Sequence, residues 1–146
     1  MWIYNQETNF EIPNDSIGFI YQITNLLDGR IYIGRKMLSS NRKAKLTKKD
    51  KLLPENKRKK FKRVVKETDW KDYWSSCDEL KLDVQKLGQD KFKRGILCFC
   101  STKSDMTFRE LYFQITKEVL FIDSYNGHVA SKFFKGKVNE ITTDID

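Results

Sequence analysis

Two short segments rich in aromatic and β-branched residues, joined by a turn, most constrain the fold of this chain. Residues 18–24 (Gly-Phe-Ile-Tyr-Gln-Ile-Thr) and residues 30–34 (Arg-Ile-Tyr-Ile-Gly) both have the composition of β-strands. The intervening Asn25-Leu-Leu-Asp-Gly29 supplies the Asn, Asp and Gly that tight turns favour. The sequence therefore predicts a β-hairpin that carries one tyrosine on each arm.

Three further elements are expected after the hairpin. Residues 78–87 predict a helix that ends at Gly88, because apolar residues recur there at helical spacing. Residues 92–100 predict a strand whose apolar half, residues 96–100, is buried on both faces. Residues 108–121 predict the strongest helix, with a core stripe of Leu111, Ile115 and Val119. This order predicts an α+β fold in which a small three-stranded antiparallel sheet is flanked by helices.

Size and composition limit the class of protein. A chain of 146 residues with 13% aromatic residues suits one folded domain and argues against bulk disorder. No stretch approaches the roughly 18 uncharged apolar residues of a membrane span, and the start lacks the pattern of a secretory signal. Three cysteines are too few and too irregular for a disulfide framework, so a reducing cytoplasm is the expected compartment.

The positive charge is concentrated in one segment. Residues 42–66 hold 13 Lys and Arg side chains and only two acids, Asp50 and Glu55. Residues 55–69 are expected to form an exposed loop or a ragged helix. Clustered cations release counterions from nucleic-acid backbones, so a nucleic-acid surface is one reading of this run, and a solvated flexible loop is the other.

A set of short motifs resembles the GIY-YIG nuclease superfamily. The hairpin carries Phe19-Ile-Tyr21 and Tyr32-Ile-Gly34, and Arg42 follows eight residues past that glycine. Glu110 opens the predicted long helix after the third strand, and Tyr125-Asn126 comes after it. Further strings narrow the resemblance to the phage-encoded Seg-type endonucleases, over roughly residues 1–128: Trp2-Ile-Tyr-Asn5, Asp69-Trp-Lys-Asp-Tyr-Trp-Ser-Ser76, Leu87-Gly-Gln-Asp-Lys-Phe92 and Glu118-Val-Leu120.

Two positions depart from the pattern of that superfamily. Phe19 stands where the first motif has its glycine, and the change is tolerable because the tyrosine carries the chemistry. Gly95 stands where relatives usually have an acidic residue, and it should weaken its strand by about 0.5–1 kcal/mol. Neither change is expected to abolish activity.

The resemblance implies a metal-dependent phosphodiesterase site. Glu110 would hold one Mg²⁺ (or Mn²⁺) together with phosphate oxygens and waters, which suits a cation that needs only one or two carboxylates. Arg42 would fork onto phosphate oxygens. Tyr21 would be the general base and Tyr32 would position water or share the proton, while Asn126 would orient a neighbouring group.

The general base requires a phenolate, and nearby cations could favour one. The expected DNA-binding cations all follow the second motif in the sequence: Arg35, Lys36, Lys43, Lys45, Lys57, Arg58, Lys59, Lys60, Lys62 and Arg63.

Structural alternatives remain for these residues. The two tyrosines suit ordinary strands. Glu110 fits a capping box in Thr107-Phe-Arg-Glu110, which would make it a helix-start residue. Cys98 and Cys100, with Cys77 and His128, could in principle bind zinc, although their spacing favours buried reduced thiols.

The sequence therefore predicts a nuclease domain over residues 1–128, with a basic insert around residues 42–66, and a partly disordered C-terminal extension over residues 129–146. The expected function is metal-dependent endonuclease cleavage of double-stranded DNA, of the phage homing type, by a monomer that could pair transiently on DNA. The cytoplasm of an infected host cell is the expected location. The alternatives are a catalytically inactive nucleic-acid-binding module and an RNA nuclease.

Overall fold

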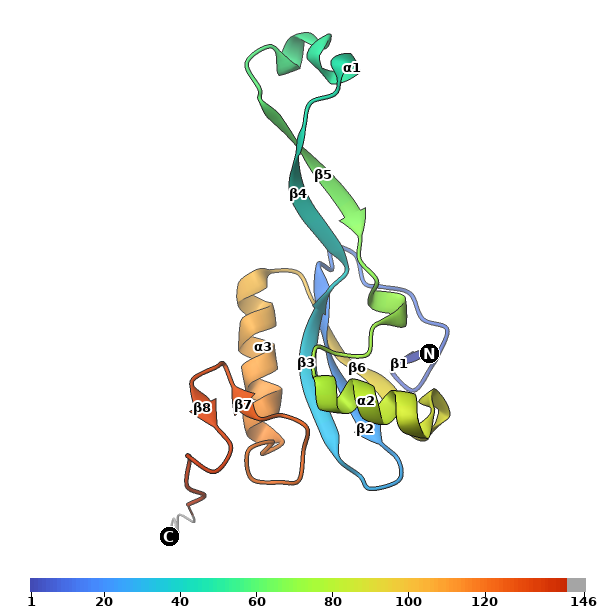
Figure 1. Ribbon diagram of the computed structural model, residues 1–146, viewed down its shortest axis with the longest axis vertical. Helices are drawn as coiled ribbons and strands as arrows, with labels where there is room; N and C mark the ends of the chain where they lie inside the picture. The colour runs from blue at the N-terminus through green and yellow to red at the C-terminus, as the bar shows by residue number, and fades with distance from the viewer. Residues whose placement is uncertain (142–146) are drawn as a thin grey trace.

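A mixed four-stranded sheet lies between two helices in the computed structural model, which describes residues 1–141 (Figure 1). The strand order is β1-β6-β2-β3, in which β6, β2 and β3 are antiparallel neighbours and β1 runs parallel to β6. The predicted α+β class and the three antiparallel strands are confirmed, and β1 adds a fourth strand. The sheet strands are β1 (Trp2–Tyr4), β2 (Gly18–Asn25), β3 (Ile31–Met37) and β6 (Phe92–Cys100).

Each face of the sheet is covered by one helix, so the core has two halves. On one face, Phe19, Tyr21 and Ile23 pack with Leu80 and Val84 of α2 (Asp78–Leu87). On the other face, residues that include Ile20, Ile33 and Met106 pack around α3 (Lys103–Thr116). Side chains of β2 point alternately to the two faces, and this alternation divides its apolar residues between the two halves of the core.

Helix α3 begins five residues earlier than predicted. Its N-cap is Thr102, whose hydroxyl accepts the backbone N–H of Asp105 at 3.0 Å. The start at Lys103 places Glu110 in the middle of the helix, so the capping-box interpretation of Glu110 is wrong. The predicted core stripe is only partly right, because Ile115 is 62% exposed whereas Val119, beyond the helix, is fully buried.

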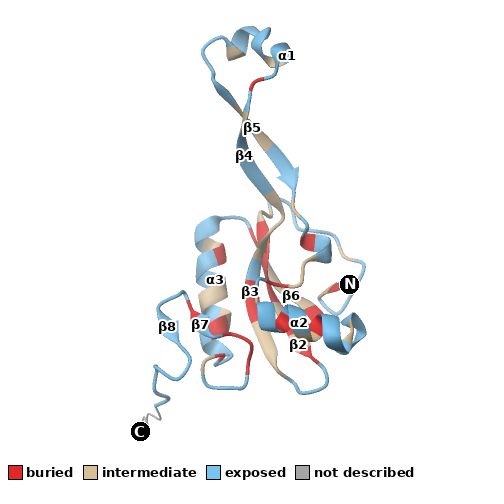
Figure 2. Cartoon of the chain, viewed as in Figure 1, coloured by how far each residue is buried: buried red, intermediate tan, exposed pale blue. Residues whose placement is uncertain are grey.

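The basic insert forms a two-stranded antiparallel ribbon that projects from the body (Figure 1). Its strands are β4 (Ser39–Lys45) and β5 (Phe61–Glu67), and its tip holds α1 (Lys48–Lys51) and the 3₁₀ turn η1 (Pro54–Asn56). The prediction of a loop or ragged helix over residues 55–69 is therefore partly wrong, because residues 61–67 of that stretch form strand β5. Apart from buried Leu46 and half-buried positions, the ribbon is exposed, whereas the buried residues gather in the body (Figure 2).

Two 3₁₀ turns, η2 (Trp70–Asp72) and η3 (Gln89–Lys91), lie before and after α2 in the sequence. After α3, the short strand β7 (His128–Val129) pairs with β8 (Phe133–Phe134). Val129 is buried against the α3 side of the core. The last part of the predicted C-terminal extension, residues 142–146, lies outside the described residues. Among residues 1–141 no helix has both the length and the apolar character needed to traverse a bilayer.

Candidate active site

A hollow of about 550 Å³ lies beside β3, the edge strand of the sheet. Its walls come from both sides of the sheet, because the tyrosines belong to the α2 side and Glu110 belongs to α3. The polar residues that line the hollow are Tyr21, Tyr32, Arg35, Ser76, Thr107, Glu110, Gln114, Asn126, His128 and Ser131. Four of the five residues that the resemblance assigned to catalysis therefore meet in one place.

The two tyrosines share one face of the hairpin, as predicted. Tyr21 is paired with Gly34, whereas Tyr32 is paired with Ile23, so the phenols are diagonal neighbours. Their ring centroids are 6.1 Å apart. The Tyr32 hydroxyl lies 3.3 Å from the Ser76 hydroxyl.

Gly34 lets the Tyr21 phenol lie across β3. A β-carbon at position 34 would stand 2.5 Å from the Tyr21 Oη and 2.8 Å from its Cζ. The same atom would stand 2.9 Å from Cε1 of Tyr32. Only a residue without a side chain leaves this space to the phenols.

Glu110 and Arg35 face each other across the hollow. The Glu110 Oε1 lies 3.9 Å from the Arg35 Nε, which is too far for a good hydrogen bond. The Arg35 Nη1 instead donates to the Thr107 hydroxyl at 3.0 Å, one helical turn before Glu110. The carboxylate thus retains lone pairs for another ligand.

The site disfavours charge on its acidic groups. Burial raises the pKa of Glu110, and the charges of Arg35 and His128 act in the opposite direction. Burial also raises the pKa of Tyr21, to which neighbouring Tyr32 and Tyr73 add, and it raises the pKa of Tyr32. The expectation that nearby cations would favour a phenolate is therefore not met, and both tyrosines are phenols at neutral pH.

Asn126 supports β3 and lines the hollow. Its Oδ1 accepts the Ile33 N–H at 2.9 Å, and its Nδ2 donates to the Ile33 carbonyl at 2.9 Å. Gln114 of α3 donates to the same carbonyl at 3.0 Å. The Asn126 amide thus occupies the place of a neighbouring strand at the edge of the sheet, which makes it a positioning residue beside Gly34.

Arg42 is not among the residues that line the hollow. It is exposed on β4, where it pairs across the ribbon with Val64. Arg35 is the arginine at the hollow, where the sequence analysis expected a DNA-binding cation that could also favour a tyrosine phenolate. The role of Arg42 as a catalytic phosphate ligand stays a prediction.

The other expected DNA-binding cations fall into two groups. Lys36 lies at the end of β3, where it pairs with Asp69 at 2.7 Å and lies 3.9 Å from the Tyr73 ring centre. The rest belong to the ribbon and its tip: Lys43, Lys45, Lys57, Arg58, Lys59, Lys60, Lys62 and Arg63.

Sequence reasoning assigned no site role to five polar residues of the hollow: Ser76, Thr107, Gln114, His128 and Ser131. Ser76 lies within a motif that carried the resemblance and Thr107 within the capping-box string, but no spacing rule connects either to the hairpin. His128 follows Asn126 by two residues, which was the available signal, and its Nδ1 accepts the backbone N–H of Ser131 at 3.1 Å.

A zinc site finds no support in the described part of the chain. Within residues 1–141 no three His, Cys, Asp or Glu side chains gather in a way that could hold a metal ion. The sulfurs of Cys98 and Cys100 lie 4.0 Å apart, and burial raises the pKa of both thiols. Cys77, Cys98 and Cys100 form no disulfide here, and their reduced state stays a prediction.

Comparison with protein families identifies the class to which this fold and site belong. Residues 2–138 match the family model described as "Putative endonuclease segE, GIY-YIG domain". Comparisons with curated proteins and with solved structures gave no match. Because the family match spans nearly the whole chain, this protein belongs to the SegE-type GIY-YIG endonuclease family.

Proposed function

We propose that this chain is a divalent-metal-dependent endonuclease that hydrolyses phosphodiester bonds in double-stranded DNA. One observation carries the proposal: two phenols, a guanidinium and a carboxylate from opposite sides of the sheet line a single hollow. A charged substrate that reached this hollow would meet a cation, a proton-carrying pair and a metal-binding oxygen within one site.

The residues present fit one hard cation. Glu110 offers a partly desolvated carboxylate whose nearest cation, Arg35, lies 3.9 Å away. Mg²⁺ commonly uses one or two protein carboxylates and keeps several waters, with substrate phosphates completing its shell. When bound, the cation would supply positive charge for the phosphoryl group and the departing oxygen.

Arg35 would hold the scissile phosphate. Its guanidinium is fixed through Nη1 by Thr107, and Nη2 remains for a phosphate oxygen. Planar guanidinium groups bind phosphate in a two-pronged way that lysine does not reproduce. In this proposal Arg35 contacts the scissile phosphate, which is the role that the resemblance implied for Arg42.

Tyr21 and Tyr32 would orient the attacking water and pass on its proton. Their raised pKa values keep both as phenols before substrate binds. A phenol both donates and accepts a hydrogen bond, so it can hold water in line with phosphorus. Ionisation of Tyr21 would then require additional positive charge near the phenol, which a bound divalent cation would supply.

One hollow implies one cut per encounter. We propose that a monomer nicks one strand, and that double-strand breaks need a second encounter or a transient dimer on DNA. By resemblance to the Seg-type endonucleases, the biological role would be phage homing in the cytoplasm of an infected host.

The competing function is a basic DNA-binding module without activity, which the exposed cations of the ribbon favour. Incubation of supercoiled plasmid with Mg²⁺ separates the two. The wild type should nick the plasmid, whereas Glu110→Gln should bind DNA in a gel-shift assay without nicking it. Binding without nicking by the wild type would establish the competing function, and preferential cleavage of single-stranded RNA would replace DNA as the substrate.

A further inference from the structure

The β4–β5 ribbon has the dimensions of a groove-binding element. It has two strands in continuous register from Ser39 opposite Glu67 to Lys45 opposite Phe61, and it stands away from the body (Figure 1). Paired strands lie about 4.8 Å apart. The major groove of B-DNA, about 12 Å wide, admits a two-stranded ribbon with its side chains.

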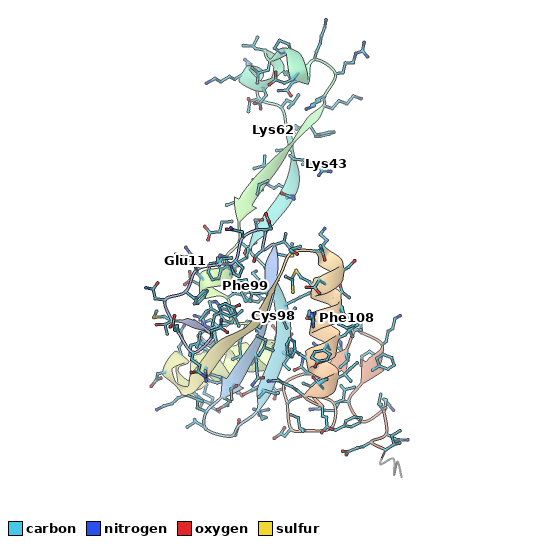
Figure 3. The ribbon with its side chains drawn as sticks, turned by 180° about the vertical axis from the view of Figure 1, so that it is seen from behind. Glu11, Lys43, Lys62, Cys98, Phe99 and Phe108 are labelled. Atoms are coloured by element: carbon cyan, nitrogen blue, oxygen red, sulfur yellow. The ribbon has the colours of Figure 1, made fainter. Side chains whose placement is uncertain are left out.

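The two faces of the ribbon differ in what covers them. One face is partly occupied: Lys62 pairs with Asp50 of the tip at 2.7 Å, and the neighbouring Ala44 and Val64 are half-buried. Figure 3 shows Lys62 and Lys43 on the two strands. By the alternation of strand side chains, Lys43 belongs to the opposite face.

We call that opposite side the open face. All of its side chains except half-buried Ser39 are exposed; its members by strand alternation are Ser39, Asn41, Lys43, Lys45, Phe61, Arg63, Val65 and Glu67. Within residues 1–141 its cations Lys43, Lys45 and Arg63 have no carboxylate within 4.0 Å. Its acid, Glu67, instead accepts from the Trp70 indole at 3.0 Å and pairs with Lys71 at 3.6 Å.

The cations of the open face are placed against one another. Lys43 lies directly opposite Arg63 in the ladder. Like charges at directly opposed positions destabilise an antiparallel pair. A polyanion seated on this face would relieve the repulsion, so the charge pattern selects a nucleic acid as the occupant.

Three members of the open face have side chains that can contact base edges as well as phosphates. Asn41 has the amide that pairs with adenine, and Arg63 has the guanidinium that pairs with guanine. Val65 is 68% exposed, and an apolar group of this kind can contact the methyl group of thymine. On this face Val65 lies opposite Asn41 and next to Arg63, so the three side chains form one contiguous patch.

From these observations we infer that the open face of the β4–β5 ribbon enters the major groove of duplex DNA and reads its sequence. The inference rests on the proposed DNA substrate and adds the element that selects the target. A-form RNA is excluded as the occupant because its major groove is too narrow for such an element.

The ribbon also fixes where the read sequence lies relative to the cut. Only Leu38 separates β3 from β4, and Thr68 closes the base of the ribbon by donating its hydroxyl to the Met37 carbonyl at 2.6 Å. Nine residues from Gly34 to Lys43 span at most about 30 Å in extended conformation. The recognised base pairs therefore lie within about one helical turn of the cleaved bond.

Selection from a random duplex pool tests the inference without cleavage. The full-length Glu110→Gln protein, kept in a metal chelator, should enrich a preferred sequence. Adding Lys43→Ala and Arg63→Ala should reduce the preference over random duplex by roughly 10- to 100-fold. The matched control, Lys81→Ala with Lys86→Ala on α2, removes the same charge far from the ribbon and should enrich the same sequence as the parent.

Methylation of guanine N7 marks the major groove and gives a second readout. Methylated guanines within the enriched sequence should be depleted from the bound fraction of the parent and of the control, but not of the ribbon variant. No preferred sequence, an identical preference in the ribbon variant, no interference, or competition by duplex RNA equal to that of duplex DNA would each overturn the inference.

The groove inference and the proposed nuclease function can be contradicted separately. A wild type that does not nick plasmid, but whose ribbon selects a sequence, contradicts the nuclease proposal and leaves the groove inference standing. A wild type that nicks plasmid without a ribbon-dependent preference contradicts only the groove inference.

Discussion

Gly34 lies directly opposite Tyr21 in the β2–β3 ladder, and the Tyr21 phenol fills the space that a side chain at position 34 would need. The motif Tyr32-Ile-Gly34 thus ends in glycine because the Tyr21 phenol needs the space of a β-carbon at position 34. The backbone of Gly34 is ordinary strand, so the restriction comes from the phenols and not from the torsion angles.

Gly34→Ala should therefore both destabilise the fold and disturb the site. The new β-carbon would stand 2.5 Å from the Tyr21 Oη, and such overpacking costs about 1–3 kcal/mol. The free energy of unfolding in urea measures the loss. Gly95→Ala is the matched control, since its β-carbon would meet nothing closer than the Gln22 carbonyl at 3.7 Å, and it should be neutral or stabilising by about 0.5–1 kcal/mol. Equal stability of the two variants would contradict the close approach.

Arg42→Ala should impair DNA binding and not the cleavage step. Arg42 is exposed on the ribbon, outside the hollow, so its loss should lower the salt dependence of binding by about one phosphate contact. Single-turnover nicking at saturating DNA should stay within a few-fold of wild type. A loss of 100-fold or more at saturation would instead show that the ribbon folds back on the substrate and that Arg42 acts as the motif spacing implies.

Asn126→Ala should destabilise the edge of the sheet. The variant removes both hydrogen bonds to Ile33 and leaves its buried N–H without a partner, which costs about 1–3 kcal/mol. Thermal and urea unfolding measure the effect. Unchanged stability together with lost nicking would contradict the positioning role and point to direct participation in the reaction.

The stability of the fold should fall in alkali. Burial raises the pKa of Tyr21 and Tyr32, and burial followed by the hydrogen bond that Tyr125 donates to Asp83 raises the pKa of Tyr125 to about 12. A folded-state pKa above the unfolded value of about 10 gives stability that is complete below pH 10 and is lost as the pH rises through the folded value.

Phenolate absorbance and circular dichroism, followed together, test this sign. The phenolate absorbance of the buried tyrosines should appear only well above a pH of about 10 and together with unfolding. Tyr21→Phe should reduce this high-pH absorbance change by one tyrosine. A Tyr21 phenolate that forms near neutral pH in the free protein would contradict the assignment of a phenol and would revive a preformed base.

The predictable parts of the fold were those with a clear apolar pattern. Leu80 and Val84 at helical spacing, followed by Gly88, gave helix 78–87 with its observed bounds, and the continuous apolar run gave strand 92–100. The ribbon was missed because strand signals depend on one buried face, and the open face of β4 and β5 carries cations. The start of α3 was missed because several Ser and Thr residues near Thr102 compete as N-caps.

The candidate site, like the fold, could be predicted from the sequence only in part. The motifs identified Tyr21, Tyr32 and Glu110, which the structure brings to one hollow. Arg35 could not be distinguished from the neighbouring cations by sequence, because its place beside Glu110 depends on how α3 packs against β3.

Single-turnover nicking of supercoiled plasmid with Mg²⁺ by Glu110→Gln, Arg35→Ala and the double variant tests most directly whether one hollow performs the cleavage. Each single variant should lose on the order of 100-fold or more, and the double variant should be little slower than the slower single, because groups that act on one transition state are strongly non-additive. Losses that multiply in the double variant, or wild-type nicking by either single variant, would contradict a shared site.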